Sequence, residues 1–321
     1  VPNIMKVIKP LFLDELTEKY ARIQDDVKKL RLLLNRLGKI KFFDPACGSG
    51  NFLIIAYKCI RELEIEIWER IKTLQGGQSE FPFSNITLQQ FYGIEIDEYA
   101  CDTATLSLWL AEHQMNNKFY ERLGTRPDAL PLRPSGHIVC GNACRLDWNT
   151  VCPHTADEEV YVMGNPPYLG SKIQDENQKE DMAIALSELK EQKSVDYIAA
   201  WFWNGAKYIE NTRARYAFVS TNSISQGEQV GMLWPHIFNK GLEIFFARTS
   251  FKWENNAKHN AAVICTIIGV SNKYEGVKLL YNETTNECHR VKSINPYLSA
   301  DSNVIVSKSA RPKEIPPMLF G

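Results

Sequence analysis

The sequence feature that most constrains the fold is the segment Asp44–Phe52, which reads DPACGSGNF. An apolar run at residues 40–43 precedes it and a periodic apolar segment follows it, which predicts a turn from a buried strand into a helix. Gly48 and Gly50 permit positive φ angles, and without Cβ atoms they let a ligand approach the backbone and the free N–H groups of a helix N-terminus. The turn is therefore either a small-molecule site or a plain connector between strand and helix.

The bulk composition is that of an ordinary globular protein. The chain has 321 residues, of which 44% are hydrophobic, enough for one large α/β domain or two smaller ones. Its net charge of -1 argues against binding of nucleic acid through the charge of the whole chain, but is compatible with a local basic surface. No apolar run approaches the roughly 18 residues of a membrane span, and no charged-then-apolar leader opens the chain. We therefore expect a cytoplasmic protein.

The eight cysteines are scattered through expected core elements, without the paired spacing of a secreted disulfide framework. Such usage is typical of a reducing cytosol. The one group that could form a zinc site is Cys140, Cys144, Cys152 and His154. It lacks a CxxC pair, so we expect ordinary thiols and no metal.

A second strand–turn–helix unit begins with residues 91–97, which read FYGIEID. Glu95 and Asp97 end this short strand, and a helical apolar pattern follows at residues 100–111. An acid in this place, one unit after a Gly-rich turn, suits the hydroxyls of a ribose. The alternative is a helix N-cap, a role that Asp97 could fill.

Strands and helices alternate along most of the chain. Residues 2–37 have a helical pattern that ends at Gly38, and further helices are expected at 196–209 and 229–238. Expected later strands are 137–140, 160–163, 216–219, 244–247 and 261–270, the last two forming an antiparallel edge pair. This alternation predicts a mainly parallel, doubly wound sheet, with ligands at the carboxyl ends of its strands. The polar segment 169–194 is expected to be a loop over the site.

The tetrapeptide Asn165–Tyr168, NPPY, follows an expected buried strand. Two consecutive prolines fix the backbone and remove two N–H donors, which leaves the Asn165 side-chain oxygen and a proline carbonyl as acceptors. Two such acceptors suit a planar amino group, and Tyr168 can stack on the ring that bears it. The alternative is a simple Pro-Pro turn at the end of a strand.

These three motifs, in this order, resemble S-adenosylmethionine-dependent DNA adenine methyltransferases of the gamma arrangement. Residues 113–116 (HQMN), 165–170 (NPPYLG) and 251–255 (FKWEN) look more specifically like the methyltransferase region of the MmeI-like, type IIL restriction–modification proteins. The resemblance implies a class I, Rossmann-like fold with a doubly wound, mainly parallel seven-stranded sheet and one antiparallel edge strand. It also implies three parts: an N-terminal helical segment packing on the core (1–38), a catalytic domain (39–290) and a linker toward an absent target-recognition domain (291–321).

The resemblance assigns the cofactor S-adenosylmethionine to one set of positions. Its methionine moiety is implied at Asp44, Ala46, Gly48 and Gly50, with Asn165 also in contact. Glu95 is implied to hold the ribose hydroxyls and Ile96 to pack on the adenine ring. Asn142 stands where the family usually has an aspartate that holds the adenine amino group, so this contact lacks its usual charge here.

The resemblance assigns the target base to another set of positions. Asn165 and Pro166 are implied to bind the amino group of an adenine flipped out of the duplex, with Tyr168 stacked on its ring. Phe251, expected in the loop between the last two strands, is implied to cover the other face, with Trp253 as the alternative. Cys47 lies in the cofactor turn, outside a Pro-Cys context, and is not expected to be a nucleophile.

The implied reaction is direct methyl transfer to the N6 amino group of adenine in duplex DNA, within a restriction–modification protein that has nuclease and target-recognition domains. Binding of DNA by this chain without the recognition domain is expected to be weak. Two alternatives stay open: methylation of a glutamine side-chain amide in protein, which an NPPY site can also perform, and a catalytically silent module that binds cofactor or DNA.

Overall fold

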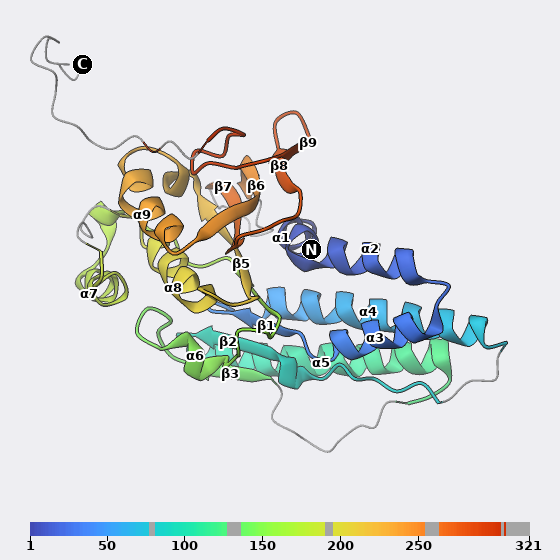
Figure 1. Ribbon diagram of the computed structural model, residues 1–321. Coiled ribbons are helices and arrows are strands. Elements are labelled where there is room, and N and C mark those ends of the chain that lie inside the picture. The colour runs from blue at the N-terminus through green and yellow to red at the C-terminus, as the bar shows by residue number, and fades with distance from the viewer. Residues whose placement is uncertain (77–80, 127–135, 190–194, 254–262, 303–304, 306–321) are drawn as a thin grey trace, which may run out of the picture.

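The computed structural model describes residues 1–76, 81–126, 136–189, 195–253, 263–302 and 305 (Figure 1). Its strands are β1 (Lys41–Asp44), β2 (Phe91–Glu95), β3 (His137–Cys140), β4 (Val160–Gly164), β5 (Arg215–Thr221), β6 (Leu242–Trp253), β7 (Val263–Asn272), β8 (Lys278–Asn282) and β9 (Glu287–Val291). Within these residues they form one sheet in the order β3-β2-β1-β4-β5-β7-β6-β8-β9.

The expected doubly wound, mainly parallel sheet is confirmed. Strands β3, β2, β1, β4 and β5 pair in parallel. Strand β7 runs antiparallel to both β5 and β6, so it lies inside the sheet, and the antiparallel edge is β9 instead. Strands β8 and β9 are additional to the seven expected. They form a hairpin whose first strand pairs in parallel with β6.

Helices cover both faces of the sheet. They are α1 (Pro2–Ile8), α2 (Asp14–Ile23), α3 (Val27–Leu37), α4 (Asn51–Leu74), α5 (Glu98–Leu123), α6 (Trp148–Val151), α7 (Glu176–Ala185), α8 (Ala199–Ile209) and α9 (Glu228–Asn239), and a π-helical turn (Lys9–Leu13) joins α1 to α2. The long helices α4 and α5 run side by side, with α1 to α3 on the same side of the sheet (Figure 1). Helices α6 to α9 belong to the opposite side.

Alternation along the central strands produces two separate hydrophobic cores. Phe42 faces the core beneath α1 to α5, whereas its neighbour Phe43 faces the core beneath α6 to α9. Successive side chains of a strand point to opposite faces, so a strand buried on both faces is apolar at every position. This explains the unbroken apolar runs that marked the strands in the sequence.

The N-terminal helical segment packs on the sheet. The Phe12 ring lies 5.1 Å from the rings of both Phe42 and Tyr161. Helix α3 ends at Leu37 with Gly38 as its C-cap, at an ordinary helical φ of -68°. The glycine is needed for space, because a Cβ there would lie 2.9 Å from Cβ of Asn85.

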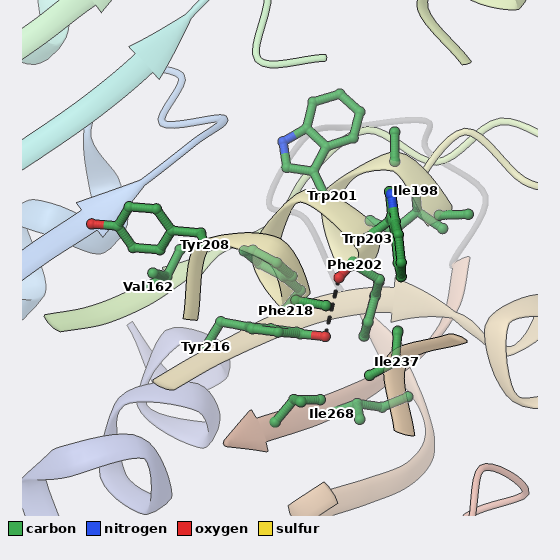
Figure 2. Close-up of a cluster of buried hydrophobic side chains, with 14 of the residues drawn as sticks. Val162, Ile198, Trp201, Phe202, Trp203, Tyr208, Tyr216, Phe218, Ile237 and Ile268 are labelled. Carbon is green, nitrogen blue, oxygen red and sulfur yellow. Dashed lines mark hydrogen bonds between the residues drawn. The ribbon is translucent and has the colours of Figure 1, made fainter. Parts of the chain in front are cut away.

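The second core is built around α8 and β5. The rings of Phe202, Tyr216 and Phe218 pack at centroid distances of 5.1 to 5.9 Å. Figure 2 shows the one polar link among these rings, in which the Tyr216 hydroxyl donates to the Phe202 carbonyl at 3.2 Å. Trp201, on the same helix, points away from this cluster (Figure 2) and reaches the turn after β1.

Two expectations about local structure are wrong. The segment 169–194 is not simply a loop, because it contains α7, which begins at a capping box between Asp175 and Gln178. Phe251 lies inside β6 and not in a loop, because pairing with β7 extends that strand to residue 253. Residues 254 and 255 of the expected loop lie outside the described residues.

The end of the described chain also packs on the protein. Ile294 and Leu298, which fall in the expected linker, are buried in the core beneath α6 to α9. Within the part of the chain that the structure describes, no helix is long and apolar enough to span a membrane.

Candidate active site

A cavity of about 550 Å³ opens at the carboxyl ends of β1, β2, β3 and β4. Parallel strands place their carboxyl ends at one edge of a sheet, so loops far apart in sequence meet there. Beyond the strand ends, the cavity is bounded by α7 and by the start of α8. Its walls are formed by Pro45, Ala46, Ile94, Glu95, Ile96, Gly141, Asn142, Ala143, Arg145, Pro167, Asp175, Asn177, Gln178, Asp181, Tyr197 and Trp201.

The Gly-rich turn links β1 to α4, as expected. Gly48 and Gly50 have φ angles of +51° and +83°, values that favour glycine. A Cβ on Gly48 would meet no described atom within 4 Å, whereas one on Gly50 would lie 3.3 Å from Cβ of Ala104. Trp201 Nε1 donates to the Pro45 carbonyl at 3.1 Å. The turn is therefore held from α8, and there is free space beside Gly48 where a side chain would stand.

Asp44 ends β1 and is almost fully buried, with 1% of its surface exposed. Its Oδ1 atom accepts from the Ala46 N–H at 3.0 Å. Burial raises the pKa of Asp44 to about 8, and the nearby Glu95 charge acts in the same direction. A Cβ on Gly164 of the neighbouring strand would lie 2.5 Å from Oδ1. A buried carboxyl group of this kind is suited to a cationic partner.

Glu95 ends β2 and is held by three backbone donors. Its Oε2 atom accepts from the Gly48 N–H at 2.8 Å, and its Oε1 atom accepts from the N–H groups of Ile96 and Asp97 at 2.9 and 3.1 Å. Asp97 caps α5 by accepting from the Ala100 N–H at 2.7 Å. The two acids therefore have different roles: Asp97 is the helix cap, and Glu95 lines the cavity. Ile96 is 68% exposed and lies in the cavity wall.

Asn142 follows β3 and belongs to a polar network that the sequence did not reveal. Its Nδ2 atom donates to Oδ2 of Asp181 at 2.9 Å, and its Oδ1 atom accepts from the Cys144 N–H at 2.9 Å. Asp181 also accepts from Arg145 Nε at 2.6 Å and from the Tyr197 hydroxyl at 2.7 Å. The capping box at Asp175 was the available sequence signal for the helix that carries Asp181.

Asn165 follows β4, and its Oδ1 atom is buried with no hydrogen-bond partner among the described residues. Pro166 is buried and Pro167 is exposed at the cavity. The loop after β4 is held by buried Asp196, which accepts from the Leu169 N–H at 2.9 Å and from the Ser223 hydroxyl at 3.2 Å. The loop that carries this free acceptor is therefore anchored by the Asp196 side chain.

Tyr168, in the loop after β4, and Phe251, on β6, both neighbour Cys265 of β7. The Tyr168 hydroxyl lies 3.9 Å from Sγ of Cys265, and Cys265 pairs with Phe251 across β7 and β6. Burial raises the pKa of Tyr168 to about 12, so its hydroxyl stays neutral. Lys6 of α1 places its Nζ atom 4.2 Å from the centroid of the Phe251 ring. This cation on the aromatic ring is a contact that the sequence did not reveal.

The expected site residues thus fall into three groups. Ala46, Glu95, Ile96 and Asn142 form part of the cavity wall, together with Pro167. Residues outside the wall that lie at or after the ends of β1 and β4 are Asp44, Gly48, Gly50, Asn165, Pro166 and Tyr168. Phe251 lies farther along the sheet, on β6. Trp253 ends that strand.

Cys47 is buried inside the turn. Its thiol faces Gly93, where a Cβ would lie 2.9 Å from Sγ. Burial raises the pKa of this thiol, which opposes formation of the reactive thiolate. This environment agrees with the expectation that Cys47 is not a nucleophile.

The residues present fit an elongated cofactor with a cationic amino acid at one end and a nucleoside at the other. A buried carboxyl group and a Gly-rich turn with free space beside Gly48 lie at β1, a carboxylate lies at β2, and apolar and amide groups lie at β2 and β3. The cavity volume of about 550 Å³ is in the usual range for such ligands.

The chain is similar to proteins described as DNA methyltransferases. A family model described as the DNA-methyltransferase domain of MmeI matches residues 20–282. DNA methyltransferase A of Bacillus subtilis (strain 168) is 52% identical over 325 residues, covering 100% of this chain and 36% of that protein. A putative type II restriction enzyme and methyltransferase of Methanocaldococcus jannaschii is 34% identical over 131 residues, covering 41% of this chain and 11% of that protein.

Among solved structures, the type IIL restriction–modification enzyme MmeI in complex with DNA superposes with a TM-score of 0.89 at 40% identity. That match covers 97% of this chain and 42% of the MmeI chain. The chain therefore spans well under half the length of the relatives that match all or nearly all of it.

Proposed function

The chain belongs to the family of MmeI DNA-methyltransferase domains, and from this membership we propose that it transfers a methyl group from S-adenosylmethionine to N6 of adenine in duplex DNA. Members of such families use S-adenosylmethionine as the methyl donor. Adenine N6 as the acceptor is the specific part of the proposal.

The observation that carries this proposal is the unpartnered acceptor of Asn165. A buried oxygen atom without a hydrogen bond is unfavourable, by about 1–3 kcal/mol, and is uncommon in folded proteins. The two prolines that follow it supply no N–H group. A planar amino group with two N–H bonds would satisfy the Asn165 oxygen together with a proline carbonyl, and the N6 group of adenine is such a group.

In our proposal, Asn165 and the backbone around Pro166 bind the N6 amino group of the target adenine, which receives the methyl group. By accepting its two hydrogens, they orient its lone pair and stabilise the positive charge that develops on it during transfer. When bound, S-adenosylmethionine supplies an electrophilic methyl group on sulfonium. Asp44 and the Gly48 backbone hold its amino acid end, Glu95 holds the ribose hydroxyls, and Ile96 packs on the purine.

Tyr168 and Phe251 hold the target base. An adenine inside a duplex cannot reach the end of β4, so the base must leave the stack and lie against aromatic rings. The charge of -1 on the whole chain supplies little attraction for DNA. We therefore propose that the domain acts within a longer cytoplasmic restriction–modification protein, in which nuclease and target-recognition parts contribute to binding and choosing the site.

The test is transfer of tritiated methyl groups from S-adenosylmethionine to unmethylated duplex DNA, followed by nucleoside analysis. It is run with this chain and with the full-length protein that contains it. Labelled N6-methyladenine is the expected product. Label in cytosine or in protein glutamine, or cofactor binding without any labelled DNA from either protein, would overturn the proposal.

A further inference from the structure

The part of the cavity at the end of β3 carries an acid–amide pair formed by Asp181 and Asn142. The inference drawn from this pair rests on the proposed function, because it concerns the purine of S-adenosylmethionine. The sheet order fixes where that purine lies. The strand ends follow one another in the order β4, β1, β2, β3. With the amino acid end at Asp44 on β1 and the ribose at Glu95 on β2, the purine reaches the loop after β3.

The orientation of the Asn142 amide is fixed from both sides. The Cys144 N–H is a donor, so the atom facing it at 2.9 Å must be the oxygen, Oδ1. The Asp181 carboxylate is an acceptor, so the atom facing it at 2.9 Å must be the nitrogen, Nδ2. An amide oxygen accepts two hydrogen bonds, so Oδ1 keeps one position for a ligand.

Asp181 is held as a carboxylate, although only 4% of its surface is exposed. Burial opposes ionisation, but hydrogen bonds from Arg145, Asn142 and Tyr197 outweigh it and lower the pKa of Asp181. A hydrogen bond to a charged acceptor is stronger than one to a neutral acceptor, and it polarises the amide that donates it. The Asn142 oxygen therefore becomes a better acceptor than that of an isolated asparagine.

We propose that Asp181 on α7 is a positioning residue for cofactor recognition, which orients and polarises Asn142 so that its oxygen accepts the exocyclic amino group of the purine. The negative charge of this subsite resides on α7 and not on the loop after β3. Only one of the side chains at positions 142 and 181 can then be a carboxylate, because a second carboxylate would face the first at 2.9 Å.

The experiment measures binding of two ligands by calorimetry, with no methyl transfer involved. S-adenosylhomocysteine carries the amino group, and S-inosylhomocysteine carries a carbonyl oxygen in its place. Wild-type protein should prefer the adenosyl ligand by about 10- to 100-fold, because the inosyl oxygen would oppose the Asn142 oxygen. The ratio of the two affinities reports this contact, whereas a general loosening of the cavity would weaken both ligands alike.

In Asp181→Asn, the preference should fall severalfold, because Asn142 then donates to a neutral acceptor, which fixes and polarises its amide less than a carboxylate does. The matched control is Glu180→Gln, which removes an equal charge from the preceding residue of α7. Glu180 pairs with Arg145 at 2.9 Å and is 62% exposed in its side chain. The control should leave the preference unchanged.

A second pair of variants separates recognition from folding. Asn142→Asp should bind the adenosyl ligand more weakly than wild type, because it opposes two carboxylates. Adding Asp181→Asn to it should recover both the affinity and the preference, because one carboxylate and one amide again face each other. Thermal unfolding without ligand shows whether each variant is folded.

The inference would be overturned by an unchanged preference in Asp181→Asn, or by additive losses in the double variant. In either case, binding of the adenosyl ligand to wild-type protein would still support the cofactor assignment. Absence of binding of either ligand to wild type would overturn the cofactor assignment and the inference together.

Discussion

The N–H of Gly48 donates to Oε2 of Glu95 at 2.8 Å, which joins the turn after β1 to the end of β2. Glu95 thereby has two tasks in our proposal. It accepts hydrogen bonds from the ribose hydroxyls, and it holds the Gly-rich turn in the conformation that the methionine end requires. The ribose part and the methionine part of the proposed cofactor site are therefore linked through this carboxylate.

Substitution of Glu95 should therefore affect stability as well as binding. In Glu95→Ala, the N–H groups of Gly48, Ile96 and Asp97 lose their acceptor, and we expect a loss of about 1–3 kcal/mol in the free energy of unfolding without ligand. Binding of S-adenosylhomocysteine should weaken by at least about 10-fold. Denaturant unfolding and calorimetry measure the two effects. Asp97→Asn is the control, because an asparagine also caps α5 and binding should persist.

Cofactor binding should release a proton from Asp44. The pKa of this carboxyl group is raised to about 8 by burial, so much of it is protonated at pH 7. Its carboxylate form is the one that attracts the cofactor's ammonium group, so affinity should rise with pH up to about 8 and then level off. Calorimetry in buffers of different ionisation enthalpy counts the released protons. In Asp44→Asn, binding should be weak and the pH dependence lost. A flat profile in wild type would exclude Asp44 from the ammonium site.

The same raised pKa predicts a pH effect on stability without ligand. The folded state binds a proton more tightly than the unfolded chain, whose aspartate has its ordinary pKa of 3.8. This contribution to stability is complete below pH 3.8 and is lost as the pH rises through about 8. Asp44→Asn should remove that part of the pH dependence and keep the acceptor for the Ala46 N–H. Denaturant unfolding at several pH values measures the difference between the two proteins.

Asn165→Ala should separate catalysis from binding. The variant removes the acceptor proposed for the target amino group, so methyl transfer should fall to background. Because the Asn165 oxygen has no partner in the described structure, the free energy of unfolding should stay the same or rise, by up to about 1 kcal/mol. The affinity for S-adenosylhomocysteine should change little. If cofactor binding collapsed as well, our division of roles between Asn165 and the turn would be wrong.

Phe251→Ala should weaken DNA use and leave cofactor affinity intact. Stacking of a base on an aromatic ring contributes about 1–3 kcal/mol, so we expect KM for duplex DNA to rise by at least about fivefold. Phe251→Tyr keeps an aromatic ring and should stay close to wild type, whereas Phe251→Leu keeps only apolar volume and should resemble the alanine variant. Fluorescence of 2-aminopurine at the target position reports whether the base leaves the stack.

Residues with a strong local signature were predicted well from the sequence. The turn at Gly48, the strand ends at Glu95 and Asn165, and the helices over 199–209 and 228–239 lie where the patterns indicated. These elements combine a glycine or proline constraint with an unbroken or periodic apolar pattern, and both signals act over a few residues.

Elements with a weaker signature were missed. Helix α7 is polar on most of its surface, so its apolar period was hidden, and its capping box at Asp175 was its clearest mark. The hairpin of β8 and β9 has mostly exposed or half-exposed side chains and depends on pairing with β6. The sequence pattern predicts a loop at Phe251, because this residue belongs to a strand only through its pairing with Cys265 on β7.

The class of fold and the chemical character of the proposed site follow from the sequence, because the order of the motifs and their glycines, prolines and acids are local properties. Which of these groups meet depends on tertiary structure. Asp181 accepts from Asn142, which precedes it by 39 residues, and Lys6 lies over the ring of Phe251, which is far from it in the sequence. Such contacts depend on how the strands are ordered in the sheet and on which helix packs over which strand end. A local sequence pattern does not specify which distant segment a residue will contact.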